Sequence, residues 1–333
     1  MRKWLLIVLA IILLAVGTVI CAYRWQAWFV TPAEPAWTGD TLQDVFQTPD
    51  STNDSIETIL VLGDIHSRLT RADYDLLATR VPDADLVMQV GDWMDRGQEY
   101  YRQLLLREWT NSALNGLPVI ACPGNHEYSK GVHKSLSDAW SETFRHPNNG
   151  PVGVPGASYW LDIPRMRVIV IDTNPLSHVV YLTRTLTWLR EAMYSAGNRA
   201  VVVMMHHPVL SAAKGRANPA IYSTFRYALS QADLVIAGHD HFYARRTPFV
   251  MLNTAGKAKK QKTKLHAEVC DSVAVYGVLS IQRSAISDQR SAISDQPSVF
   301  SDQRSAISDQ PSVFSIHRMS DGVAIDTIYV KHD

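Results

Sequence analysis

The chain has 333 residues, of which 46% are hydrophobic and 19% are charged, and its formal net charge is zero. This length suits one large globular domain with additional segments. Nucleic-acid-binding surfaces carry a basic excess, so the balanced charge gives no indication of a nucleic-acid partner.

The N-terminal segment is apolar on every face. Residues 4–23 carry no charged side chain and are long enough, as a helix, to cross a membrane. Arg2 and Lys3 precede them, which favours a cytoplasmic N-terminus and an exported body. We therefore expect residues 1–23 to be a transmembrane signal anchor; the alternative is a cleaved signal peptide and a secreted protein. Residues 24–55 contain scattered prolines and polar clusters and predict a linker.

From residue 56 onward, apolar strand-like runs alternate with amphipathic helical ones. Strands are expected at 59–62, 86–90, 118–121, 167–171, 200–205, 234–237, 273–281 and 323–330. Helices are expected at 70–81, 99–114, 135–144, 182–194 and 217–230. This alternation, with a few consecutive strands, predicts two sheets packed face to face and flanked by helices.

The three cysteines, Cys21, Cys122 and Cys270, show no paired spacing. Neither a disulfide framework nor a thiolate zinc site is indicated. For Cys122 and Cys270 we expect two separate buried thiols rather than a bridge between them.

A repeat occupies residues 283–315. The segment 290–301 recurs letter for letter at 304–315, and a truncated copy stands at 283–289. The sequence just before the repeat closely matches the sequence at its end, so the repeat is interpreted as an in-frame duplication extruded from a strand or hairpin. It has too few large apolar residues to bury a face, and a passive loop is favoured over a binding segment.

Five of the predicted strands end in short polar motifs. These are Gly-Asp-Ile-His (63–66), Gly-Asp-Trp-Met-Asp-Arg-Gly (91–97), Gly-Asn-His-Glu (124–127), His-His-Pro (206–208) and Gly-His-Asp-His (238–241). Ligands of open α/β sheets gather where strands end. A single Asp or His there is usually a turn former or a surface residue, but five such endings in one chain predict a metal site. Asp, Asn and His suit manganese, iron, zinc or magnesium.

In this order, the five motifs resemble those of the calcineurin-like metallophosphoesterase superfamily, from about residue 58 to 243. The resemblance implies an α/β fold, a four-layer α/β/β/α sandwich of two mixed sheets, for a domain spanning residues 56–333. It also implies two divalent or trivalent metal ions at the strand ends. One ion would be held by Asp64, His66, Asp92 and His241. The other would be held by Asp92, Asn125, His206 and His239.

The same resemblance implies a metal-dependent phosphoester hydrolase, in which a metal-bridging hydroxide attacks phosphorus in line. His126 would act as the general acid for the leaving alcohol or stabilise the transition state. Asp95 would orient His126, and Arg96 would clamp the phosphate with its planar fork. Glu127 is expected to support the structure around the site. His207 either lines the pocket or packs against the rest of the protein.

The subfamily and the substrate stay open. Purple acid phosphatases carry a tyrosine where this chain has Asp95, and the serine/threonine phosphatases lack the Gly-His-x-His ending. Arg96 slightly favours a monoester, with a nucleotide or lipid head-group diester close behind. The alternative function is a catalytically silent metal-binding or sensor module on the same fold.

Overall fold

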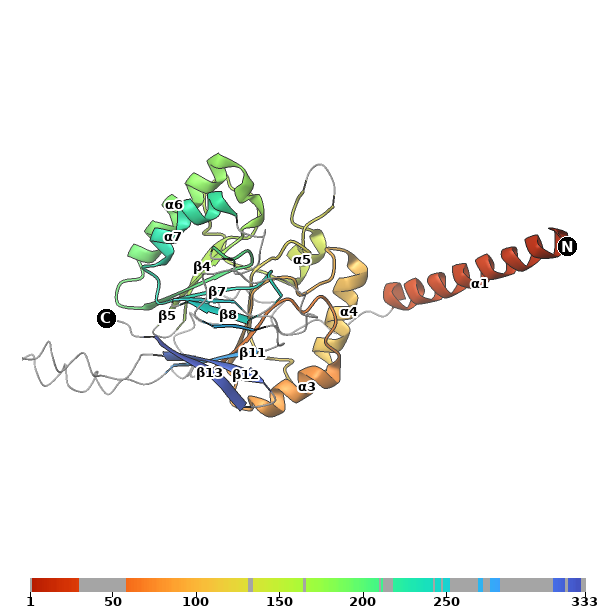
Figure 1. The fold of residues 1–333 in the computed structure, drawn as a ribbon, viewed down its shortest axis with the longest axis horizontal. Coiled ribbons are helices and arrows are strands. Elements are labelled where there is room, and N and C mark those ends of the chain that lie inside the picture. The colour runs from red at the N-terminus through yellow and green to blue at the C-terminus, as the bar shows by residue number, and fades with distance from the viewer. Residues whose placement is uncertain are drawn as a thin grey trace, which may run out of the picture.

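The computed structural model describes residues 2–29, 58–130, 134–163, 166–209, 211, 218–241, 243–246, 248–251, 269–271, 276–281, 314–320 and 323–330. Two mixed sheets face each other, and helices cover the outer face of each (Figure 1). The predicted α/β fold with two mixed sheets flanked by helices is confirmed.

Six strands form the first sheet, in the order β13-β12-β11-β1-β2-β3. Its parallel part is β1 (Thr58–Leu62), β2 (Leu86–Gln89) and β3 (Val119–Ala121). Its antiparallel part is β11 (Tyr276–Ile281), β12 (Phe314–Ser320) and β13 (Val323–Val330). The outer face packs against α3 (Arg71–Arg80), α4 (Glu99–Thr110) and α5 (Asp138–Thr143).

Seven strands form the second sheet, in the order β10-β8-β9-β7-β6-β5-β4. In chain order they are β4 (Tyr159–Ile163), β5 (Met166–Ile171), β6 (Ala200–Met205), β7 (Leu234–Ala237), β8 (Tyr243–Arg246), β9 (Phe249–Met251) and β10 (Val269–Asp271). β5, β6, β7 and β9 are parallel. The outer face packs against α6 (Val179–Tyr194) and α7 (Pro219–Leu229), with the short 3-10 helix η1 (Asn174–Ser177) before α6.

The central strands are buried on both faces, which explains why they read as continuous apolar runs. In β1, Ile59 and Val61 point into the core between the two sheets, whereas Leu60 and Leu62 pack under the helices. The two-residue period of a strand produces this division. The sheets are thus held together by one apolar layer, and each carries a second apolar layer outside.

Helix starts follow their capping residues. Thr70 caps α3 in a capping box with Asp73, and Asn218 caps α7 immediately before a proline. The helix expected at 135–144 is shorter, because Ser137 caps it and α5 begins only at Asp138. Sequence patterning did not find β4, β8, β9, β10 and β12. Of these, β8, β9 and β10 have only three or four residues, too few to show a periodicity of their own.

The repeat lies in the connection between β11 and β12. These strands pair antiparallel, with Ile281 opposite Phe314, so the connection closes a hairpin, as expected for an extruded insertion. The last two letters of the final copy, Phe314 and Ser315, belong to β12. Residues 282–313 lie outside the described residues.

Deleting residues 290–303, one full copy of the repeat, is expected to leave activity and stability unchanged. Both strand ends are paired on either side of the connection, and halving a loop changes the closure free energy by only about 0.6 kcal/mol. Thermal unfolding and a steady-state assay of the deletion variant measure this. A loss of activity with unchanged stability would instead support a binding role for the repeat.

Helix α1 spans Arg2–Phe29 and extends away from the two sheets (Figure 1). It continues past residue 23 into the segment expected to be a linker, and residues 30–57 lie outside the described residues. Within the described part of the chain, no helix combines the length and the apolar character that crossing a membrane requires. The predicted transmembrane anchor is not confirmed.

Cys122 is a buried free thiol at the end of β3, and burial raises its pKa. Its sulfur lies 3.6 Å from the carbonyl oxygen of Ile171 in the facing sheet. The expectation of an unbridged, buried Cys122 is confirmed.

Candidate metal centre

The loops after β1 and β2 are joined to the loops of the second sheet. The N–H groups of Asp64 and His66 donate to the carbonyl oxygens of Gly91 and Asp92, at 3.1 and 2.8 Å. The N–H of His239, after β7, donates to both carboxylate oxygens of Asp64, at 3.0 and 2.9 Å. Residues far apart in sequence therefore meet at one edge, where the strands of both sheets end.

The backbone of these loops is left-handed at six residues other than glycine: Asp64, His66, Ser67, Asp92, His239 and His241, with φ between 53° and 72°. These are all the non-glycine residues with positive φ in the described chain. Each such residue costs on the order of 1–2 kcal/mol. Five of them are predicted metal ligands, so the strain is concentrated where side chains must converge.

The first group of side chains is Asp64, His66, Asp92 and His241, all buried. One potential ligand atom of each lies within 4.8 Å of those of the other three. His66 Nε2 is 3.2 Å from His241 Nε2 and 3.8 Å from Asp92 Oδ2, and His241 Nε2 is 3.5 Å from Asp64 Oδ1. The structure thus brings together the four residues predicted for one metal ion.

The second group gathers around His206. Its Nε2 lies 3.2 Å from Asp92 Oδ2 and 3.2 Å from Asn125 Oδ1. Its Nδ1 is 2.9 Å from the carbonyl oxygen of Val90; a carbonyl only accepts, so Nδ1 carries a proton and Nε2 faces the site. The ring of His239 is 5.1 Å from that of His206. Asp92 belongs to both groups, with Oδ2 between His66 and His206.

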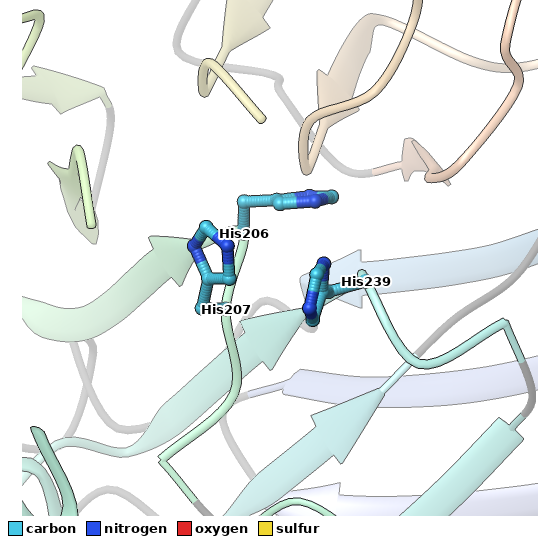
Figure 2. A group of neighbouring side chains, drawn as sticks. All are labelled: His206, His207 and His239. Atoms are coloured by element: carbon cyan, nitrogen blue, oxygen red, sulfur yellow. The ribbon is translucent and has the colours of Figure 1, made fainter. Parts of the chain in front are cut away.

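His207 lies with the second group, which resolves the alternatives left by the sequence. Figure 2 shows its ring beside those of His206 and His239. The ring centroids of His207 and His239 are 4.3 Å apart, and His207 Nδ1 is 2.6 Å from the hydroxyl of Thr173. His207 therefore lines the site rather than packing in the core.

His126 approaches the site from the loop after β3. Its N–H donates to Asp92 Oδ1 at 2.9 Å, and its ring Nε2 is 4.0 Å from Asp92 Oδ2. Asp95 was expected to hold this ring through its carboxylate, but the partner of Nδ1 is the backbone carbonyl of Asp95, at 2.5 Å. The carboxylate Oδ1 of Asp95 lies 4.0 Å from the same Nδ1. The hydrogen bond of the ring thus goes to the backbone of Asp95, and the orienting role expected for this residue stays a prediction.

We therefore expect Asp95→Asn to keep its turnover within about tenfold of wild type. The substitution leaves the backbone carbonyl in place, so His126 keeps its hydrogen bond and its orientation. A carboxylate that oriented the ring would matter much more, by about a hundredfold or more. Steady-state kcat on a phosphoester decides between the two, and a loss above a hundredfold would contradict the structure-based expectation.

Arg96 was expected to clamp the phosphate. Its side chain is exposed and makes no hydrogen bond or ion pair with any residue that the structure describes. It shares the loop of Asp92 and Asp95, and its predicted role stays a prediction.

Glu127 fixes two of the loops to each other. Its carboxylate accepts from the N–H groups of Asp92 (2.9 Å), Gly124 (2.7 Å) and Met94 (2.8 Å). Only glycine fits at position 124, where the backbone lies against the Asp92 side chain, because a Cβ there would be 2.2 Å from Asp92 Oδ1. Burial and the charge of Asp92 raise the pKa of Glu127 to about 8.

Sequence reasoning missed the support that follows β5. Asp172 is buried, and Oδ2 accepts from the hydroxyl of Tyr128 (2.5 Å) and the N–H of Ala157 (3.0 Å). Its Oδ1 accepts from Asn174, whose side-chain amide also reaches the carbonyl of Gly124 at 3.3 Å. The signal was available: Asp-Thr-Asn at 172–174 also follows directly on a predicted strand.

Burial and pairing set the ionisation of the site. Burial lowers the pKa of His66 to about 3, so this imidazole is neutral near pH 7. Burial alone would lower the pKa of His206 too, but the negative charge of Asp92 outweighs it and raises that pKa to about 10. Against burial, His206 in turn holds the pKa of Asp92 below its ordinary value. Before a cation binds, His206 is therefore protonated and Asp92 is ionised.

We expect metal binding to release protons and to strengthen as the pH rises from 6 to 8. His206 can coordinate only after losing its proton, and its pKa of about 10 lies above this range. The affinity for the ion that it binds should rise by about tenfold per pH unit from this group. Calorimetric titration with Zn²⁺ in buffers of different ionisation enthalpy measures affinity and proton release together. Heats and affinities independent of pH and buffer would contradict this.

Comparison with known proteins agrees with this geometry. The model of the calcineurin-like phosphoesterase family matches residues 57–243. No curated protein matches the chain in sequence. Among solved structures, the chain is similar to GAP50, the anchor in the inner membrane complex of Plasmodium, with a TM-score of 0.54 and 13% identity, covering 83% of this chain and 89% of that chain.

The chain is also similar to the purple acid phosphatase PPD1 from yellow lupin (Lupinus luteus) seeds. The TM-score is 0.51 and the identity 13%, over 84% of this chain and 54% of that chain. At this identity the two structures show a shared fold, and the family match covers more than half of the sequence. The chain belongs to the calcineurin-like phosphoesterase family.

Proposed function

We propose that this protein hydrolyses phosphoesters with a pair of metal ions. The observation that carries the proposal is the position of Asp92, whose carboxylate lies within 3.8 Å of His66 and 3.2 Å of His206. One carboxylate between two sets of ligands is what a pair of closely spaced cations requires. One set is Asp64, His66, Asp92 and His241, and the other is Asp92, Asn125, His206 and His239.

The donor atoms fit such ions. Carboxylate and amide oxygens combine here with imidazole nitrogens, a mixture suited to manganese, iron, zinc or magnesium. His206 already has its Nδ1 proton directed to a carbonyl, which leaves Nε2 for coordination. Two ions in this place would activate water for attack on phosphorus and neutralise charge on the phosphoryl oxygens.

Residues of the chain itself supply the remaining steps. His126 donates from Nδ1 to the carbonyl of Asp95, presents Nε2 to the site and, in its doubly protonated form, gives the Nε2 proton to the oxygen of the leaving alcohol. Arg96, in the loop that carries Asp92, binds the phosphate; its permanent charge favours a dianionic monoester over a diester. The candidate substrates are small phosphomonoesters, nucleotides and lipid head groups.

A phosphoester panel tests the proposal. The full-length protein is analysed for bound metal and assayed with p-nitrophenyl phosphate and bis-p-nitrophenyl phosphate. We expect two metal ions per chain and faster turnover of the monoester. His126→Ala should keep both ions and lose turnover by about a hundredfold or more. Absence of metal and of hydrolysis would favour the silent sensor module instead.

We further propose that the catalytic domain is extracytoplasmic and is held at a membrane by its N-terminal segment. The sequence supports this, because Arg2 and Lys3 precede the uncharged residues 4–23. The full chain and a variant lacking residues 2–29 are expressed and extracted with alkaline carbonate. Only the full chain should stay in the membrane pellet. Release of a shortened chain into the medium would indicate a cleaved signal peptide.

A further inference from the structure

His207 has no place in the two sets of proposed ligands, yet its ring lies among them. One nitrogen of each of His206, His207 and His239 lies within 4.8 Å of those of the other two (Figure 2). Two roles are open to an imidazole in this position. It could bind the metal through a lone pair, or it could donate a hydrogen bond to whatever binds the metal.

The hydroxyl of Thr173 decides between them. Thr173 is buried, and its Oγ1 accepts from the backbone N–H of His207 at 3.2 Å. Its hydroxyl proton needs an acceptor, and among the described residues the only one within reach is Nδ1 of the same His207, at 2.6 Å. If Nδ1 carried a proton, the Thr173 proton would be buried without an acceptor, which costs about 1–3 kcal/mol.

Thr173 therefore donates to Nδ1, and the proton of the neutral His207 ring sits on Nε2. A nitrogen that carries a proton has no lone pair for a metal. We propose that His207 is a catalytic residue that donates a hydrogen bond from Nε2 to a phosphoryl oxygen of the substrate at the second metal group, and that Thr173 is the positioning residue that fixes this tautomer. This inference rests on the proposed function of the site.

The geometry around Thr173 makes the arrangement rigid. Thr173 follows β5, and His207 follows the neighbouring parallel strand β6, so paired strands set their spacing. The next residue after Thr173 is Asn174, whose amide reaches the loop of His126. The β5 end thus supports two histidines that face the substrate, one through Thr173 and one through Asn174.

The test uses full-length protein loaded with metal, with inorganic phosphate as the probe. Variants are His207→Ala, His207→Gln, Thr173→Val and Thr173→Ser, with His178→Ala as a control at an exposed histidine. We expect His207→Ala to keep both metal ions and to weaken phosphate inhibition and kcat/KM by about ten- to a hundredfold. His207→Gln places an amide N–H near Nε2 and should recover most of this loss.

Thr173→Ser keeps the hydroxyl and should behave as wild type. Thr173→Val removes the hydrogen bond that fixes the tautomer of His207 and should weaken phosphate binding severalfold. Loss of one metal ion from His207→Ala would overturn the proposal and make His207 a ligand. Phosphate inhibition of His207→Ala within twofold of wild type would also overturn the proposal.

The outcome is distinguishable from failure of the proposed function. If the metal-loaded wild type hydrolyses no phosphoester, phosphate affinity is measured by calorimetry, and the same comparison of variants decides the role of His207. If the wild type neither hydrolyses phosphoesters nor binds phosphate, both proposals fall.

Discussion

Asp92→Asn is expected to abolish phosphoester turnover while leaving the fold intact. The carboxylate is the one group that belongs to both sets of proposed ligands, and Oδ2 lies closest to His206, at 3.2 Å. An amide of the same shape keeps an oxygen for the N–H of His126, which now bonds Oδ1, but it loses the charge that two cations share. Stabilisation by a pair of ions is worth several kcal/mol, so turnover should fall by at least about a thousandfold.

Metal analysis gives an independent reading of the same variant. We expect the metal content to fall from two ions per chain to one or none, because the ions lose the ligand between them. Asp138→Asn, an exposed carboxylate in the first turn of α5, is the control that removes equal charge elsewhere. A variant with two bound ions and activity within tenfold of wild type would refute the assignment of Asp92 as the shared ligand.

Sequence patterning located the proposed ligands because of how the sheets are built. Strands buried on both faces are apolar throughout, so the change to Gly-Asp or His-His marks a strand end sharply. Parallel strands bring their ends to one edge, and this placed Asp64 beside Asp92. The meeting of the two sheets, which adds His206 and His241, followed from the resemblance rather than from periodicity.

What patterning missed depends on contacts between distant segments. No rule of spacing shows that His126 bonds to the carbonyl of Asp95 rather than to its carboxylate, because this depends on the path of a strained loop. The role of Thr173 is likewise visible only when β5 is placed beside β6. A role that depends on a contact between two distant residues can be assigned only from the structure, whereas polar residues at the ends of strands can be located from the sequence.

Glu127→Ala is expected to destabilise the metal-free protein by about 3 kcal/mol or more. Three buried N–H groups, those of Asp92, Met94 and Gly124, donate to this carboxylate and would lose their acceptor. Each buried donor left unsatisfied costs about 1–3 kcal/mol, against a total stability of about 5–15 kcal/mol. Urea unfolding at pH 6 measures it, because the wild-type carboxyl, with a pKa of about 8, is then neutral and the cost of burying its charge does not offset the loss of the acceptor.

Glu127→Gln separates the acceptor role from simple packing. Its single carbonyl oxygen can still accept from Asp92 and Gly124, which share Oε2, but its NH₂ group then faces the N–H of Met94. The cost should therefore lie between wild type and Glu127→Ala. Glu142→Ala, at an exposed position of α5, should change stability by less than about 0.5 kcal/mol. A Gln variant as stable as wild type, with the Ala variant destabilised, would show that packing, and not the three N–H groups, accounts for the effect. In that case the loops of Asp92 and His126 would owe their geometry to Asp172 and Asn174 instead.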